Sequence, residues 1–230
     1  PGSGKSFFLR WLAVAPHTLG GADAVAVLLP VAALGPSAGL RPLEARAIDY
    51  LLEVAPLAAH ALDVWAREGR LTWLIDGLDE TGDRGSREVM VASLEAFTKR
   101  WSTCDVIVTS RVAGYDEAPL SDAFGVSQLA PLSPAAIERF LVQWLTLYAR
   151  QARGTSPQVD SEARAQAQAL ASDVLASERL SALAQTPLLL TLIAILQRTG
   201  LRLPRSRVEL YEHITRVLVE RWNRVRSRAE

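Results

Sequence analysis

Apolar runs and helical periodicity alternate along the first half of the chain. Three apolar runs are bounded by Gly, Pro or polar residues, which is typical of buried strands. They lie at residues 24–34, 71–75 and 105–109, and residues 125–129 predict one more short strand. Helical spacing of apolar residues occupies residues 5–14, 45–52, 57–68 and 86–100. Strands that alternate with such helices predict an α/β fold with a parallel sheet covered on both faces.

The pattern after Pro131 is helical throughout. Ser133 predicts a helix cap and Pro134 the first helical position. The expected helices lie at residues 134–150, 161–176, 179–183, 188–198 and 205–228. We therefore predict two domains, an α/β domain at residues 1–131 and an all-α domain at residues 132–230.

Composition and charge narrow the class of protein. The 230 residues are 49% hydrophobic, which is enough for a sizeable core. The 25 basic residues balance the 25 acidic ones, so no overall field attracts nucleic acid or anionic lipid. The longest apolar run, residues 187–196, is shorter than the roughly 18 residues that a membrane span needs. A single cysteine, Cys104, fits a reducing compartment, so we expect a cytoplasmic protein without a membrane span.

The first six residues, Pro1-Gly2-Ser3-Gly4-Lys5-Ser6, match the end of the phosphate-loop pattern G-x-x-x-x-G-K-[ST]. Its first glycine would lie upstream of Pro1, so we expect a fragment that begins inside the motif. Gly2, Ser3 and Gly4 would turn backbone N–H groups toward a polyphosphate, Lys5 would reach the phosphates, and Ser6 would bind Mg²⁺. Only Lys5 and Lys99 among the basic residues are lysines, which favours a specific role for Lys5. The alternative is a flexible Gly/Ser terminus.

A second candidate motif, which is acidic, follows the apolar run at residues 71–75. Asp76 comes directly after it, at the end of a strand where α/β sheets bind ligands, and is the expected Mg²⁺ ligand. Asp79 and Glu80 would orient the attacking water near the γ-phosphate. The alternative is an ordinary solvated acidic turn.

Polar residues also follow the run at residues 105–109. Arg111 would contact the γ-phosphate through charge-assisted hydrogen bonds. The alternative is a surface arginine in an arginine-rich chain.

Taken in this order, the glycine-rich loop, Asp76-Gly77-Leu78-Asp79-Glu80 and Thr109-Ser110-Arg111 resemble the NACHT family of STAND-type signalling NTPases. The segment Thr186-Pro187-Leu188-Leu189-Leu190 looks like the family's segment that places a proline against adenine, which assigns Pro187 to the base. The resemblance covers nearly the whole chain. Its fold is a P-loop NTPase parallel sheet, with the first strand missing here, followed by a helical subdomain.

The resemblance implies a nucleotide switch with ATP or ADP and Mg²⁺. ADP holds a closed monomer, and ATP permits self-association while hydrolysis is slow. The Ala- and Arg-rich composition suits a bacterial NACHT protein, a group that includes proteins of signal transduction and antiviral innate immunity; this step is analogy. The alternatives are a scaffold that binds ADP without hydrolysis and a motor-type AAA+ ATPase.

The missing first strand also leads to a prediction about geometry. In the order expected for this class, that strand lies between the strand ending at Asp76 and the strand ending near Thr109. Residues 71–75 and 105–109 should then be parallel and separated by a one-strand gap of roughly 10 Å. The unpaired backbone groups facing that gap would make the chain poorly stable.

Overall fold

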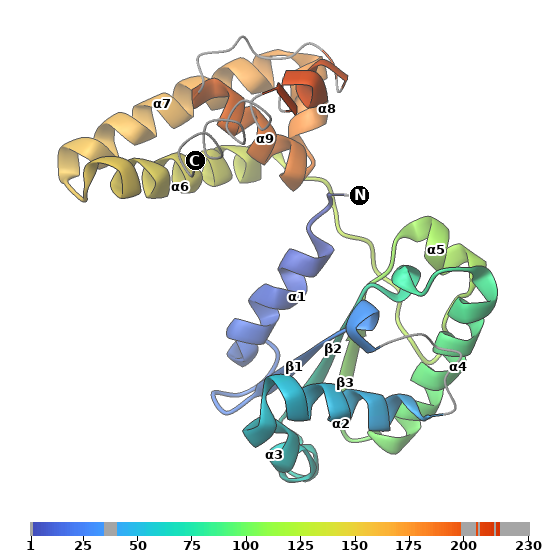
Figure 1. The fold of residues 1–230 in the computed structure, drawn as a ribbon. Coiled ribbons are helices and arrows are strands. Elements are labelled where there is room, and N and C mark those ends of the chain that lie inside the picture. The colour runs from blue at the N-terminus through green and yellow to red at the C-terminus, as the bar shows by residue number, and fades with distance from the viewer. Residues whose placement is uncertain (1, 35–40, 199–205, 207, 214, 217–230) are drawn as a thin grey trace, which may run out of the picture. The chain divides into compact units, whose positions relative to one another are not determined.

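The chain forms two compact units. A computed structural model describes residues 2–34, 41–198, 206, 208–213 and 215–216. One unit consists of residues 5–128, and the other of residues from 129 onward together with residues 2–4. Figure 1 shows a sheet with surrounding helices in the first unit and helices in the second.

The sheet of the first unit is parallel and has three strands in the order β1-β2-β3. The strands are β1 (Val25–Pro30), β2 (Leu71–Asp76) and β3 (Asp105–Val108). The strand β2 pairs directly with β3, with Thr72 opposite Asp105 and Ile75 opposite Val108. The predicted one-strand gap between them is therefore wrong, and the instability that we derived from it loses its premise. Direct pairing satisfies the backbone groups that such a gap would leave unpaired.

Helices cover both faces of this sheet because β2 carries apolar side chains on both sides. Leu74 packs on one face against Leu9 and Leu12 of α1 (Lys5–Val14). Trp73 and Ile75 face the larger core on the other side, which α2 (Leu43–Val54), α3 (Pro56–Arg67) and α4 (Arg84–Arg100) supply. Every residue of β2 before Asp76 is buried, and Asp76 itself is partly exposed, so its carboxylate lies where the strand leaves the core.

The elements of this unit agree with most of the sequence predictions, with two corrections. The helix predicted from Lys5 to Val14 is confirmed. The apolar run at residues 24–34 is a strand only to Pro30, after which Val31–Leu34 form a 3-10 helix. The strand predicted at residues 125–129 is wrong: these residues have no regular structure and are exposed, so they bury no apolar face. The described part of this unit also contains two further 3-10 helices, Pro16–Thr18 and Leu78–Glu80, and the short helix α5 (Val112–Glu117).

The second unit consists of helices packed around their own core. They are α6 (Pro134–Arg153), α7 (Pro157–Ala176), α8 (Glu178–Ala184) and α9 (Pro187–Arg198). The cap predicted at Ser133 is confirmed, since its side chain accepts a hydrogen bond from Ala136 N–H at 3.3 Å. Of the helix predicted at residues 205–228, residues 208–213 and 215–216 are helical and the rest, apart from Ser206, lies outside the described residues. In the described part of the chain, no single helix is long and apolar enough to cross a membrane; the bent pair α8 and α9 reaches that composition only together.

Ion pairs connect α6 and α7, which lie side by side in Figure 1. Arg150 donates two hydrogen bonds, of 2.8 and 2.6 Å, to the carboxylate of Asp160. Arg153 donates one of 2.7 Å to Glu162. The hydrogen bond from Arg150 lowers the pKa of Asp160, and the one from Arg153 lowers the pKa of Glu162.

The direction of these pKa shifts predicts how the α6–α7 pair responds to acid. A carboxyl whose pKa is lower in the folded state stabilises that state above its ordinary pKa, and the stabilisation is lost as the pH falls through the lowered value. We expect Arg150→Gln to lower the melting temperature at pH 7. The difference from the wild type should begin to shrink near pH 4 and vanish once the pH lies below the lowered pKa of Asp160. Thermal unfolding followed by circular dichroism at several pH values measures this. Arg139→Gln, an exposed change of equal charge on the same helix, is the control; a difference that persists in strong acid would contradict the prediction.

Candidate functional site

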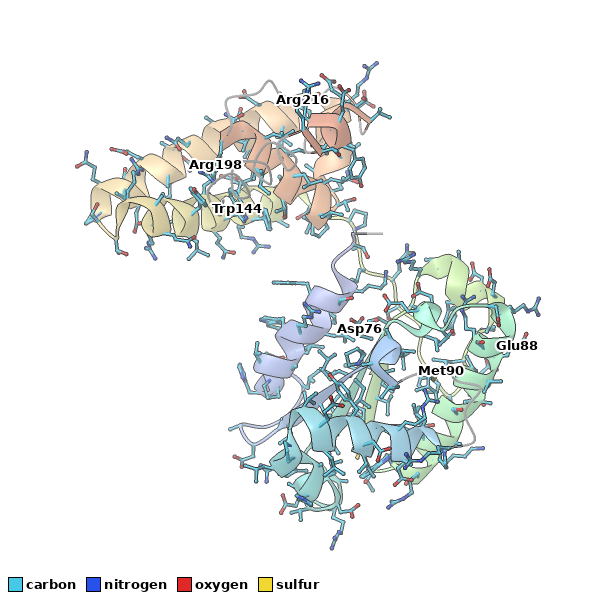
Figure 2. All side chains as sticks on the ribbon, in the orientation of Figure 1. Asp76, Glu88, Met90, Trp144, Arg198 and Arg216 are labelled. Atoms are coloured by element: carbon cyan, nitrogen blue, oxygen red, sulfur yellow. The ribbon has the colours of Figure 1, made fainter. Side chains whose placement is uncertain are left out.

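The ends of β2 and β3 meet at one edge of the sheet, where a hydrogen-bond network joins them. Thr109 follows β3 and donates its hydroxyl to Asp76 Oδ1 at 2.7 Å. The same hydroxyl accepts a hydrogen bond from the N–H of Gly77 at 3.1 Å. Thr109 is only 8% exposed, so its hydroxyl is largely shielded from water, whereas Asp76 is partly exposed. The network fixes the Asp76 carboxylate at the carboxyl end of β2, where Figure 2 labels it.

The start of α1 reaches the same carboxylate. Ser6 Oγ, in the first turn of α1, donates to Asp76 Oδ1 at 3.1 Å across 70 positions of sequence. The two residues predicted to bind one Mg²⁺ are therefore in contact.

A hydroxyl and a carboxylate are the oxygen ligands that Mg²⁺ accepts, together with water and phosphate oxygens. Within the described residues no group of three or more His, Cys, Asp and Glu side chains could hold a metal. The donor set at Asp76 thus fits an ion that takes few protein ligands and completes its shell with phosphate.

The carboxylate of Asp79 is occupied by Arg111. Its Oδ1 accepts a 2.8 Å hydrogen bond from the Arg111 backbone N–H, and its Oδ2 lies 3.2 Å from Arg111 Nε. The Asp79 side chain is 10% exposed. Its Cβ also lies against α5, because a Cβ built on Gly114 would be 2.5 Å away from it. Two predicted site residues are therefore in contact, because the Asp79 carboxylate binds both the backbone and the side chain of Arg111.

Glu80 has a different environment. Its residue is exposed, and its side chain folds back over Gly77. A Cβ on Gly77 would lie 2.8 Å from Glu80 Cδ, and Gly77 has a φ of +83° that L side chains rarely adopt. Only glycine at this position lets the Glu80 carboxyl lie over the backbone directly after Asp76.

Of the other predicted nucleotide-binding residues, Lys5 opens α1 in the first unit, whereas the remaining ones belong to the second unit: Gly2, Ser3, Gly4 and Pro187. Gly2 and Gly4 have φ values of +78° and +91°, the left-handed backbone that a tight glycine loop requires. The carbonyl of Gly2 accepts a hydrogen bond from Leu188 N–H at 3.3 Å. A Cβ on Gly2 would lie 2.8 Å from Leu188 Cβ, and one on Gly4 would lie 3.6 Å from Pro187 Cγ. The glycines on either side of Ser3 therefore lie against the start of α9, beside Pro187.

Sequence reasoning missed Thr109 as a partner of Asp76. It also missed Arg87 and Glu117, which form an ion pair beside the loop of Asp79, whose backbone carbonyl accepts a hydrogen bond from Arg87. Thr109 stood in the string that identified the end of β3 but had no assigned role. Arg87 left a signal, because it occupies the apolar stripe of α4 three residues before Met90. Figure 2 shows Met90 on the inner side of that helix and Glu88 on the outer side. Glu117 left none, since a carboxylate at the end of a short helix is common.

Comparison with models of known protein families finds no matching family, and comparison with curated proteins finds no matching relative. The functional interpretation therefore depends on the residues and on their geometry.

The network at Asp76 predicts an asymmetric response to changes at Thr109. Thr109→Val keeps the shape of the side chain but leaves the Gly77 N–H without its acceptor in a buried position. We expect a loss of about 1–3 kcal/mol in the free energy of unfolding, measured by denaturant titration. Thr109→Ser retains the hydroxyl and should lose much less. A larger loss in Thr109→Ser than in Thr109→Val would mean that the methyl group, and not the hydroxyl, stabilises this edge.

Proposed function

We propose that the chain is the nucleotide-binding core and first helical part of a NACHT-type P-loop ATPase. It binds ATP with Mg²⁺, hydrolyses it slowly, and uses the bound nucleotide as a conformational switch. The observation that carries the proposal is the contact of Ser6 with Asp76. In a P-loop ATPase these two positions, a hydroxyl at the start of the first helix and a carboxylate at the end of a strand, share one ion.

The phosphates are bound by Gly2, Ser3, Gly4 and Lys5. The positive φ of both glycines supports a loop whose backbone N–H groups turn toward an anion. Lys5 opens α1, so the positive end of that helix dipole adds to its ammonium charge. Pro187 contacts the adenine base, a role that rests on the resemblance.

Ser6 and Asp76 hold Mg²⁺, and Thr109 orients the carboxylate through its hydroxyl. Bound there, the ion would neutralise charge on the β- and γ-phosphates. Thr109 and Ser6 both donate to Oδ1 of Asp76, so the lone pairs of Oδ2 are left for the ion.

The two acids that follow Asp76 have separate roles. Glu80 is the exposed carboxylate and orients the attacking water. Asp79 holds Arg111 through both of its oxygens, and Arg111 contacts the γ-phosphate when nucleotide is bound. Because the Arg111 side chain is 59% exposed, it has room to change partner.

The biological part of the proposal rests on the resemblance alone. It comprises self-association in the ATP state, a signalling or defence role, and a cytoplasmic location. Slow turnover fits a switch, in which the lifetime of the bound nucleotide sets the duration of the signal.

Lys5→Ala tests nucleotide binding. We expect the affinity for ATP in the full-length protein to fall by at least about 100-fold, since roughly 3 kcal/mol of charge-assisted hydrogen bonding is lost. Isothermal titration calorimetry measures this. Lys99→Ala removes the other lysine, which is exposed on α4, and should bind like the wild type. Unchanged affinity in Lys5→Ala would remove the phosphate-loop assignment.

Glu80→Gln tests hydrolysis. Binding should be retained because Asp76 and the loop are intact, while kcat should fall roughly 100-fold with the loss of the base. A single-turnover ATPase assay measures this, with Glu88→Gln, an exposed glutamate of α4, as the control. Wild-type turnover in Glu80→Gln together with a loss in Asp79→Asn would reverse the two roles. ADP binding without any ATP hydrolysis by the wild type would favour a scaffold.

A further inference from the structure

Arg87 is a charged residue in the buried face of α4. Its side chain is only 8% exposed, and it lies on the same helical stripe as Met90, Leu94 and Phe97, which are all buried. Burying a guanidinium away from water is costly unless its charge and its hydrogen bonds are satisfied. Its partners therefore indicate what the buried charge does.

Those partners come from two segments of the candidate site. One arm of the guanidinium forms an ion pair with Glu117, at the end of α5. The other arm, Nη2, donates to the backbone carbonyls of Asp79 at 3.4 Å and of Gly82 at 3.3 Å. Its Nε has no hydrogen-bond partner among the residues that the structure describes. Arg87 thus binds the backbone of the loop that carries Asp79 and Glu80.

These contacts close a ring. Asp79 binds Arg111 through its carboxylate, and Arg111 directly precedes α5. The helix α5 ends at Glu117, which binds Arg87, and Arg87 returns to the carbonyl of Asp79. The segment from Arg111 to the end of α5 is therefore tied to Arg87 at both ends: directly through Glu117, and through Asp79 at Arg111.

We propose that Arg87 is a positioning residue for nucleotide hydrolysis. It acts through the backbone of Asp79 and through Glu117, and so keeps Glu80 and the Asp79–Arg111 pair in the geometry that turnover requires. This inference rests on the proposed function, which it deepens by adding a residue without contact to the nucleotide.

Arginine is the residue that this position needs. Its planar fork presents donors in two directions, toward a carboxylate on α5 and toward two carbonyls of the loop. A lysine ammonium is a single point charge on a flexible stem, so it cannot hold both segments in one arrangement. Arg87→Lys therefore keeps the charge and loses the fork.

The test compares Arg87→Lys and Glu117→Gln with Arg84→Gln in the full-length protein. We expect kcat to fall about 100-fold in Arg87→Lys, since a displacement of about 1 Å at a catalytic group has an effect of this size. KM for ATP should stay within about twofold, because within the described ranges Arg87 has no contact with the glycine loop, Lys5, Ser6 or Asp76, which are proposed to hold most of the triphosphate and its ion. Glu117 is half exposed, so Glu117→Gln folds more readily and should show the same split with about a tenfold fall in kcat. Arg84, an exposed arginine of α4, is the matched control and should change neither value.

Hydrogen–deuterium exchange separates this inference from the proposed function. Faster exchange in residues 78–83 and 112–117 of Arg87→Lys, but not of Arg84→Gln, is expected whether or not nucleotide is added. If the wild type neither binds nor hydrolyses ATP, the proposed function is wrong and the positioning role falls with it, while the exchange data still report on the ring of contacts. If the wild type hydrolyses ATP and Arg87→Lys has unchanged kcat, or loses kcat only together with its fold at the assay temperature, the positioning role alone is overturned.

Discussion

The hydrogen bond that Thr109 donates to Asp76 aligns the end of β3 with the end of β2, and the rest of the candidate site depends on this alignment. The strand β2 is covered on both faces and paired on both sides, so its end cannot shift without disturbing the core. The backbone bond from Leu78 N–H to the Thr109 carbonyl, 2.8 Å long, extends the alignment by one turn past the strand. The positions of Asp79 and Glu80, which follow Leu78, therefore depend on the sheet although these residues lie outside it.

Local features of the sequence were sufficient to predict much of the fold and the proximity of two pairs of residues at the sheet edge, Ser6 with Asp76 and Asp79 with Arg111. The bounds of α1 follow from the spacing of Leu9 and Leu12 after a glycine-rich start, and the end of β2 follows from the change from an apolar run to Asp76. Parallel strands then bring the residues after each strand to one edge. The contact of Ser6 with Asp76 has another basis, because the phosphate-loop pattern assigned both residues to one Mg²⁺ although they lie far apart in the chain.

Long-range choices could not be predicted in the same way. The sequences of residues 71–75 and 105–109 do not indicate which strands are neighbours. The strand order that we took from the resemblance predicted a gap between these two strands, which in fact pair directly. The environments of Asp79 and Glu80 were equally hidden, since adjacent carboxylates look alike in sequence. Their difference comes from distant partners: Arg111 takes both oxygens of the first, while Gly77 leaves space for the second. The partner of Arg87 could not be predicted either. Its place in the apolar stripe of α4 indicates that it is buried, but nothing in the sequence indicates that it pairs with Glu117.

The contact between Gly2 and Leu188 has a consequence for the helical unit. The first amides of any helix lack acceptors within it, and here the carbonyl of Gly2 supplies one to the first turn of α9. The glycine loop is therefore also the amino-terminal cap of a helix whose Leu190 and Ile193 lie in the core of its unit. A rotation of the Gly2 peptide that turned this carbonyl away would uncap α9, so the loop and the helix share a single conformational equilibrium.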